Sequence, residues 1–123
     1  MKKPSILICD DEPGVRESLK YILGEEYALA YATNGVEAVE YIKANDVDMA
    51  ILDIKMPKLN GLEALQQIKQ AKPNLPVLML TGYEAIDVAS QAMNLGANNY
   101  LTKPIHEEKV LAQVRSLLNS AEA

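Results

Sequence analysis

The chain has 123 residues, a length typical of one domain, and 49% of them are hydrophobic, which excludes a disordered tail. Its 17 acidic and 12 basic side chains give a net charge of −5, so we expect no direct nucleic acid contact. No apolar run approaches the roughly 20 residues of a membrane span, so no membrane contact is expected either. The single cysteine and the lack of a secretory signal predict a cytoplasmic location.

Strand and helix patterns alternate along the chain. Short apolar runs predict strands at residues 6–9, 28–32, 49–52, 77–80 and 99–101. Apolar residues at three- and four-residue steps predict helices that begin in turn near Pro13, Gly35, Gly61, Val88 and His106. The third helix should stop before Pro73, and Gly96 should end the fourth. The second and fifth runs are the weakest, so we expect shorter or more exposed strands there.

This alternation predicts an α/β fold with right-handed crossovers between parallel strands. At this length, the expected architecture is one doubly wound five-stranded parallel sheet in strand order 2-1-3-4-5. Helices cover both faces of such a flavodoxin-like sheet. Ligands bind beyond the carboxyl ends of the strands, near the switch in strand order, so chemistry should be sought there.

Polar residues follow the apolar runs at this edge. They are Asp10, Asp11 and Glu12 after the first strand, Asp53 after the third, Thr81 and Gly82 after the fourth, and Thr102, Lys103 and Pro104 after the fifth. Two carboxylates about 4 Å apart repel by roughly 4 kcal/mol at an effective dielectric constant of 20, so we expect a cation among them. Oxygen ligands without His or Cys select Mg²⁺ before Ca²⁺.

The same residues are suited to phosphoryl transfer. Asp53 can act as a nucleophile and become an aspartyl phosphate, while the Lys103 ammonium and the Thr81 hydroxyl stabilise the phosphoryl group. Asp10 and Asp11 are adjacent, so their side chains cannot both point the same way from a regular strand. We expect one of them to bind the cation directly and the other to act through water.

Several of these residues also have a purely structural interpretation. Asp11 or Glu12 can serve as a helix N-cap, and Asp53 taken alone can be a turn residue. Cys9 lies inside an apolar run and is expected to be inert core, and His106 is expected to be a surface residue. Only the conjunction of the polar positions at one edge favours a functional site.

The polar strand ends belong to longer motifs. These are ILICDDE at residues 6–12, LDIKMP at 52–57, NG at 60–61, LTG at 80–82 and YLTKP at 100–104. As a set they resemble the response-regulator receiver domain of two-component signal transduction, which has the chemotaxis-type receiver fold. The resemblance covers about residues 4–119 of the single receiver domain that we expect over residues 1–123.

The resemblance implies specific roles at the phosphorylation site. Asp53 would be the phosphoacceptor, taking a phosphoryl group from the phosphohistidine of a sensor histidine kinase, from a phosphotransfer protein or from a small acyl phosphate. Asp11 and Asp53 would hold Mg²⁺, with Asp10 acting through water and the backbone carbonyl of Lys55 as a further ligand. Lys103 would pair with the phosphoryl oxygens.

The resemblance also implies a switch. The Lys103–Pro104 bond would be cis, Thr81 would move toward the phosphoryl group, and Tyr100 would turn inward into the vacated space. The surface of the fourth helix, fifth strand and fifth helix would change and control an effector domain or partner protein, with a phosphorylation-dependent homodimer as one candidate assembly. Lys55 and Tyr83 would flank the acyl phosphate and influence its lifetime.

This interpretation makes the chain a phosphoacceptor switch and not an enzyme, since it would catalyse only its own phosphorylation and dephosphorylation. One alternative is a Mg²⁺-dependent phosphohydrolase, which would need an acid/base carboxylate near Asp53; Lys55, two residues on, is not one. A second alternative is a phosphorylation-independent interaction module. Nucleotide binding is disfavoured because neither G-x-G-x-x-G nor G-x-x-x-x-G-K-[ST] occurs.

Overall fold

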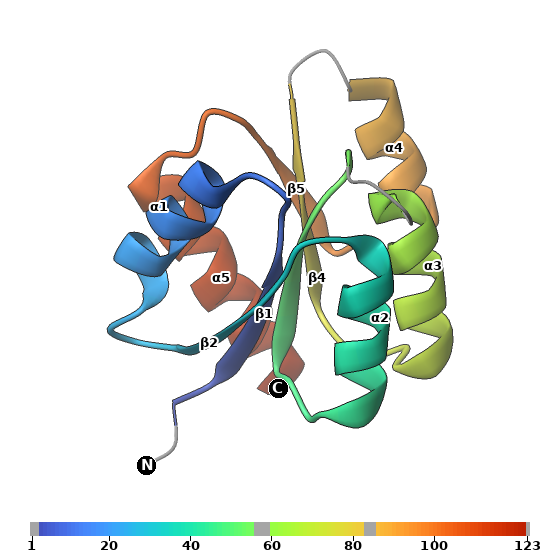
Figure 1. Cartoon of the computed structure of the whole chain (residues 1–123), viewed down its shortest axis with the longest axis horizontal. Helices are drawn as coiled ribbons and strands as arrows, with labels where there is room; N and C mark the ends of the chain where they lie inside the picture. The colour runs from blue at the N-terminus through green and yellow to red at the C-terminus, as the bar shows by residue number, and fades with distance from the viewer. Residues whose placement is uncertain (1–2, 56–59, 83–85, 123) are drawn as a thin grey trace.

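The computed structural model describes residues 3–55, 60–82 and 86–122, which form five strands and five helices in strict alternation (Figure 1). The strands are β1 (Ser5–Cys9), β2 (Ala28–Ala32), β3 (Met49–Asp53), β4 (Val77–Thr81) and β5 (Asn99–Thr102). The helices are α1 (Pro13–Leu23), α2 (Gly35–Ala44), α3 (Gly61–Ala71), α4 (Ile86–Asn94) and α5 (Glu107–Glu122).

All five strands are parallel, in the order β2-β1-β3-β4-β5, which confirms the predicted fold class. Helices α1 and α5 cover one face of the sheet, and α2, α3 and α4 cover the other (Figure 1). Strand order reverses direction between β1 and β3, and this is the switch point at which doubly wound sheets bind ligands.

Successive strand residues feed two separate cores, because side chains alternate between the faces of a strand. In β1, Ile6 and Ile8 pack toward α1 and α5, while Leu7 and Cys9 pack toward the three helices on the opposite face. Strands β1, β3 and β4 are buried along almost their whole length. The two edge strands, β2 and β5, are more exposed, as the weaker apolar runs predicted.

Three strands extend one residue further at their carboxyl ends than predicted, and β1 begins one residue earlier. Asp53, Thr81 and Thr102 are the last residues of β3, β4 and β5, so their positions are set by the sheet ladder itself. The fourth helix ends at Asn94, and Gly96 follows it with a φ of 105°, a conformation that favours glycine.

Helix α3 is held at its start by a capping box. The Asn60 side chain accepts a hydrogen bond from the Glu63 backbone N–H at 3.0 Å, and the Glu63 carboxylate accepts one from the Asn60 N–H. Helix α1 has no such cap: Glu12 precedes Pro13 without a capping hydrogen bond from its side chain. Glu12 is therefore the N-cap residue by position, one of the two candidates, but its side chain does not cap the helix.

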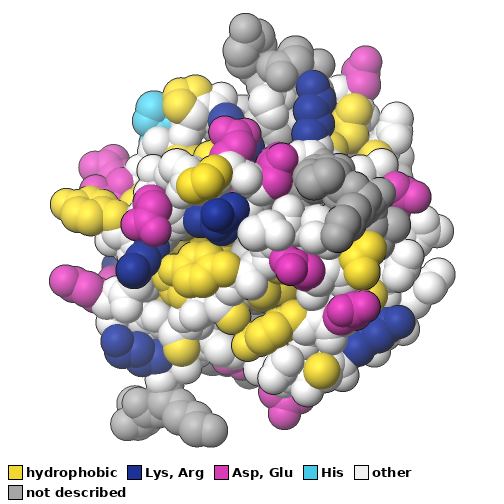
Figure 2. All heavy atoms as spheres, in the orientation of Figure 1, with side chains coloured by type: hydrophobic (Ala, Val, Ile, Leu, Met, Phe, Trp, Pro, Cys, Tyr) yellow, Lys and Arg dark blue, Asp and Glu magenta, His cyan; other side chains and the backbone are white. Residues whose placement is uncertain are grey.

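The surface carries both charge signs. Figure 2 shows acidic and basic side chains interspersed on one face, with hydrophobic side chains near its centre. Tyr21 and Tyr31 are among the large hydrophobic residues exposed in the described part of the chain. No helix of the described residues is long and apolar enough to cross a membrane.

Gly61 marks a close approach between the start of α3 and the end of β3. Its N–H donates to the Ile54 carbonyl at 2.8 Å, and a Cβ built on it would lie 2.6 Å from the Ile54 Cα and against the Asp53 carbonyl oxygen. Since both obstacles are backbone atoms, any larger side chain must push α3 away from the strand that carries Asp53.

We predict that Gly61→Ala lowers the free energy of unfolding by about 1–3 kcal/mol, the usual effect of overpacking. Gly14→Ala is the matched control, because a Cβ at Gly14 in α1 meets nothing within 4 Å. That change should stabilise the protein by about 0.5–1 kcal/mol through helix propensity alone. Urea denaturation measures both, and equal effects of the two substitutions would contradict the close-approach interpretation.

Candidate functional site

The ends of four strands meet at the switch-point edge of the sheet. Asp10 directly follows β1, Asp53 ends β3, Thr81 ends β4 and Lys103 directly follows β5. Backbone hydrogen bonds hold these ends in register: the Lys103 N–H donates to the Thr81 carbonyl at 2.7 Å. Residues separated by up to 93 positions in the chain are thereby brought together, as the end-of-strand rule predicted.

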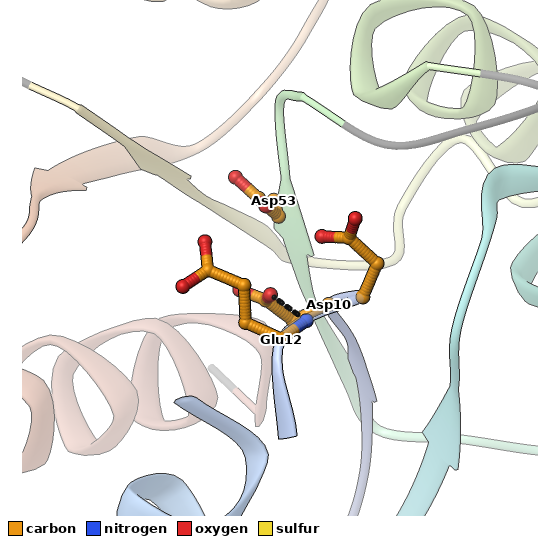
Figure 3. A group of neighbouring side chains, drawn as sticks. Asp10, Glu12 and Asp53 are labelled. Atoms are coloured by element: carbon orange, nitrogen blue, oxygen red, sulfur yellow. Dashed lines mark hydrogen bonds between the residues drawn. The ribbon is translucent and has the colours of Figure 1, made fainter. Parts of the chain in front are cut away.

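The Lys103 ammonium lies among three carboxylates. Its Nζ is 3.3 Å from Oδ2 of Asp10, 3.3 Å from Oδ2 of Asp53 and 3.2 Å from Oε1 of Glu12. Asp10 and Glu12, from the end of β1, and Asp53, from the end of β3, point into the same space (Figure 3). One cation thus offsets part of the repulsion among acids that the fold forces together.

The two adjacent aspartates have different environments. Asp10 is fully buried, and its Oδ1 accepts a hydrogen bond from the Glu12 N–H at 2.9 Å (Figure 3). Its Oδ2 has no hydrogen-bond partner among the described residues, although the Lys103 ammonium is close. Asp11 is exposed. The two side chains therefore differ in burial, although one oxygen of each lies within 4.8 Å of the other. The division of metal-binding roles between them stays a prediction.

These acids form a group that could hold a metal ion. One carboxylate oxygen from each of Asp10, Asp11, Glu12 and Asp53 can be chosen so that all lie within 4.8 Å of one another. The buried Oδ2 of Asp10 has an ion pair with Lys103 but no hydrogen bond among the described residues, which fits a site completed by a further cation, because buried carboxylate oxygens are otherwise hydrogen-bonded. An all-oxygen donor set suits a hard divalent ion.

Burial and crowding change the acidity of the site. Burial, with the neighbouring Asp10 charge, raises the pKa of Asp53 to about 6, although Lys103 opposes the shift. Burial also raises the pKa of Asp10. Burial acts to lower the pKa of Lys103, but the charges of Asp53 and Asp10, together with hydrogen bonds to Glu12 and Asp53, outweigh it and raise that pKa. The ammonium therefore stays charged wherever the carboxylates are ionised.

The acids open onto a cavity of about 280 Å³. Besides Asp11, Glu12, Asp53 and Lys103, its lining comprises Ile54, Lys55, Thr81 and Gly82. The buried Thr81 hydroxyl donates to the Gly82 carbonyl at 3.1 Å, and Lys55 is exposed at the rim. The cavity therefore gives a small solute access to Asp53, whose own exposed fraction is only 3%.

Other residues singled out in the sequence lie nearby. The Lys103–Pro104 peptide bond is cis. Tyr100, in β5, is half-buried and packs against the core under α2, α3 and α4. Met56 and Pro57 of the LDIKMP motif and Tyr83 lie outside the described residues.

The structural interpretations have mixed outcomes. Asp53 ends a buried strand, so its interpretation as a turn residue is wrong. Cys9 is fully buried, its Sγ donates to the Asn34 carbonyl at 3.2 Å, and burial raises the pKa of its thiol to about 12, which confirms inert core. His106 is exposed as predicted, and α5 begins one residue after it.

Sequence reasoning missed two contacts. Glu12 is a partner of Lys103, and Arg16 on α1 donates from Nη1 to the Asp10 carbonyl at 2.7 Å. The spacing carried a signal for the second contact, because a long side chain one turn into a helix lies over the preceding loop. No comparable feature of the sequence indicated the contact between Glu12 and Lys103, since these residues are 91 positions apart.

We predict that the ionised Asp53 side chain lowers the free energy of unfolding near neutral pH when no divalent cation is present. The folded protein keeps the Asp53 proton to a higher pH than the unfolded chain does, so this contribution to stability falls as pH rises from about 4 to about 6. The free energy of unfolding of Asp53→Asn should therefore rise relative to that of the wild type over this pH range, by up to about 3 kcal/mol.

Chemical denaturation in the presence of a chelator, repeated from pH 4 to pH 7, measures this difference. Asp87→Asn is the matched control, because it removes the same charge from an exposed position on α4. A difference between wild type and Asp53→Asn that stays constant with pH would show that burial does not perturb this carboxyl.

The chain is similar to known signalling proteins over almost its whole length. The family model described as the response regulator receiver domain matches residues 6–115. Response regulator MprA from Mycobacterium sp. (strain KMS) is 40% identical over 114 residues, which are 92% of this chain and 50% of that protein. The chain spans about half the length of the curated relatives it matches.

Solved structures agree with this similarity. A CheY-like response regulator receiver domain protein from Methanospirillum hungatei JF-1 superposes with a TM-score of 0.93 at 30% identity, covering 98% of both chains. A response regulator receiver domain protein from Clostridium thermocellum gives a TM-score of 0.91 at 31% identity, covering 97% of both chains. The chain belongs to the response regulator receiver domain family.

Proposed function

We propose that Asp53 accepts a phosphoryl group from a phosphohistidine or a small acyl phosphate in a Mg²⁺-dependent reaction. Membership of the receiver family already makes the chain a phosphoacceptor switch in phosphorylation-dependent signalling, and not a classical enzyme. One observation carries the assignment to Asp53: it is the acid that ends a central strand, lines the cavity and lies 3.3 Å from the Lys103 ammonium.

The proposed step is a displacement at phosphorus. A carboxylate oxygen of Asp53 attacks the phosphorus of the donor, and the bond from phosphorus to the donor's leaving atom breaks. The leaving group departs with the bonding electron pair, as acetate when the donor is acetyl phosphate. Asp53 must be ionised to attack, so its raised pKa of about 6 still leaves the nucleophile available at neutral pH.

Lys103 and Thr81 are placed to stabilise the phosphoryl group. The ammonium offers three donors and a fixed positive charge, and charge-assisted hydrogen bonds are the strong ones. Thr81 lines the same cavity, and its hydroxyl donates to the neighbouring Gly82 carbonyl, a local contact that it can exchange for a phosphoryl oxygen. Both groups would stabilise the negative charge that the phosphoryl group brings to Asp53.

Mg²⁺ would be held by Asp11 and Asp53, with Asp10 acting through water and the Lys55 backbone carbonyl as a further ligand. When bound, it would neutralise phosphoryl charge and the repulsion among the acids. The different burial of the two acids supports this division, because Asp10 is buried while Asp11 is open to solvent.

A phosphohydrolase acting on external substrates is less well supported. Such an enzyme needs an acid/base group beside the aspartyl nucleophile. The residue two positions after Asp53 is Lys55, and the other acids of the cavity, Asp11 and Glu12, belong to the charged cluster. We therefore assign to the domain only catalysis of its own phosphorylation and dephosphorylation.

The output is proposed to pass from Thr81 to the surface of α4, β5 and α5. Phosphorylation adds negative charge and acceptor oxygens, which would draw Thr81 toward Asp53 and leave room for Tyr100 to turn inward. A hollow of about 380 Å³ along β5 and α5 includes Tyr100, Ile105 and Lys109 in its lining, so the surface there is already recessed. A bias of about 1–3 kcal/mol suffices to shift such an equilibrium.

Family membership indicates the general kinds of partner, and we propose the specific ones. A response regulator works with a kinase and an effector. We assign to this chain a sensor histidine kinase or phosphotransfer protein as donor, and an effector domain, a partner protein or a phosphorylation-dependent homodimer as output. The acidic net charge of −5 supports a receiver without direct nucleic acid contact of its own. We also propose a cytoplasmic location without membrane contact.

We predict that incubation with Mg²⁺ and acetyl phosphate adds the mass of one phosphoryl group to the wild-type protein. Asp53→Asn removes the nucleophile, so it should gain no mass under the same conditions. Intact-protein mass spectrometry measures both. An unchanged wild-type mass, or a phosphoryl group retained in the variant, would exclude Asp53 as the acceptor.

We also predict that Mg²⁺ stabilises the protein, by about 2.7 kcal/mol at a concentration 100 times its dissociation constant. Asp11→Asn should lose most of this gain because it removes an exposed charged ligand. Glu25→Gln, which removes an exposed acid in the loop after α1, should keep it. Thermal unfolding with and without Mg²⁺ is the measurement, and equal gains in the two variants would remove Asp11 from the metal site.

A further inference from the structure

Of the three carboxylates that contact Lys103 in the described part of the chain, that of Glu12 is largely in solvent. Its exposed side-chain fraction is 61%, against 0% for Asp10 and 5% for Asp53. Among these three contacts, the one with Glu12 at 3.2 Å also meets the geometry of a hydrogen bond. Glu12 is therefore in direct contact with the ammonium and is also, of the three acids, the one that water can most easily replace.

The backbone of Glu12 is fixed while its carboxylate is not needed for the fold. Its N–H donates to Asp10 Oδ1 at 2.9 Å, and its carbonyl accepts from the N–H groups of Val15 and Arg16, both at 3.2 Å. The side chain makes no capping hydrogen bond to α1. Turning the carboxylate away from Lys103 therefore breaks the Lys103 contact without disturbing the start of the helix.

Three carboxylates match the three donors of the ammonium. A phosphoryl group on Asp53 would need at least one of those donors for its own oxygens. Asp10 is buried and cannot withdraw, and Asp53 carries the phosphoryl group itself. Of the three present partners, only Glu12 can leave the ammonium and be solvated.

We propose that Glu12 is a displaceable counter-ion of Lys103, which holds the ammonium in the unphosphorylated protein and is released when Asp53 is phosphorylated. The inference rests on the proposed function of Asp53. It makes Glu12 a positioning residue that acts through Lys103 and opposes phosphorylation.

Four proteins test this: wild type, Glu12→Gln, Glu12→Asp and the control Glu25→Gln. Glu12→Gln removes the charge, while Glu12→Asp keeps it but shortens the side chain by about 1.5 Å, beyond reach of the ammonium. If Glu12 competes for Lys103, both variants should be phosphorylated by acetyl phosphate about two- to five-fold faster than wild type, the size expected for an exposed ion pair. The control should match wild type.

The rate pattern separates competition from simple repulsion of the donor. A faster Glu12→Gln beside an unchanged Glu12→Asp would mean that only the site's charge matters, which overturns the proposal. Unchanged or slower rates in both variants overturn it as well. If wild type itself takes no phosphoryl group, the proposed function fails and the inference fails with it, whereas a phosphorylated wild type with unaccelerated variants refutes the inference alone.

A second measurement reads Lys103 directly and does not depend on the rate. The ¹³Cε–¹Hε resonance of Lys103, assigned with Lys103→Arg, should differ between wild type and Glu12→Gln in the unphosphorylated state. The two proteins should coincide once Asp53 is phosphorylated, because Glu12 has then left the ammonium. A difference that persists after phosphorylation, or that Mg²⁺ alone abolishes, would show that the phosphoryl group does not displace Glu12.

Discussion

The Lys103 ammonium, between the carboxylates of Asp10 and Asp53, is the contact on which the site depends. Parallel strands in the order 2-1-3-4-5 bring the ends of β1 and β3 side by side, and each end carries a buried acid. Without a cation, the ionised carboxylates of Asp10 and Asp53 would repel each other strongly, because an oxygen of each lies within 4.8 Å of the other. Lys103 follows β5, two strands further along the sheet from β3, and its long side chain supplies the positive charge that lets the acids remain there.

One cation does not neutralise the cluster. Four acidic side chains, those of Asp10, Asp11, Glu12 and Asp53, lie around the Lys103 ammonium. Burial is the main cause of the raised pKa values of Asp10 and Asp53, and the charge of Asp10 adds to that of Asp53. Such a site lowers the stability of the fold, but it can bind further positive charge and an electrophilic phosphoryl group. Among the three acids in contact with Lys103, the exposed Glu12 is the one that solvent can most easily draw away.

Much of the fold and the site could be predicted from the sequence because periodicity and the end-of-strand rule are strong. Asp53, Thr81 and Lys103 were located by their positions after apolar runs. The sequence alone could not tell which of Asp10 and Asp11 is buried, because that depends on how the chain leaves β1 and on the contacts of Arg16 and Glu12 with that loop. It also could not reveal how closely Gly61 approaches β3, because that distance depends on how α3 packs against the strand.

The most direct test of the account is the chemical identification of the phosphorylated residue. Borohydride reduces an acyl phosphate to the alcohol, so peptide mapping after phosphorylation and reduction marks the acceptor carboxyl. The account predicts reduction at Asp53 and at no other acid of the cluster. Reduction at Asp10, Asp11 or Glu12, or no reduced acid in a protein that has gained a phosphoryl group, would contradict it.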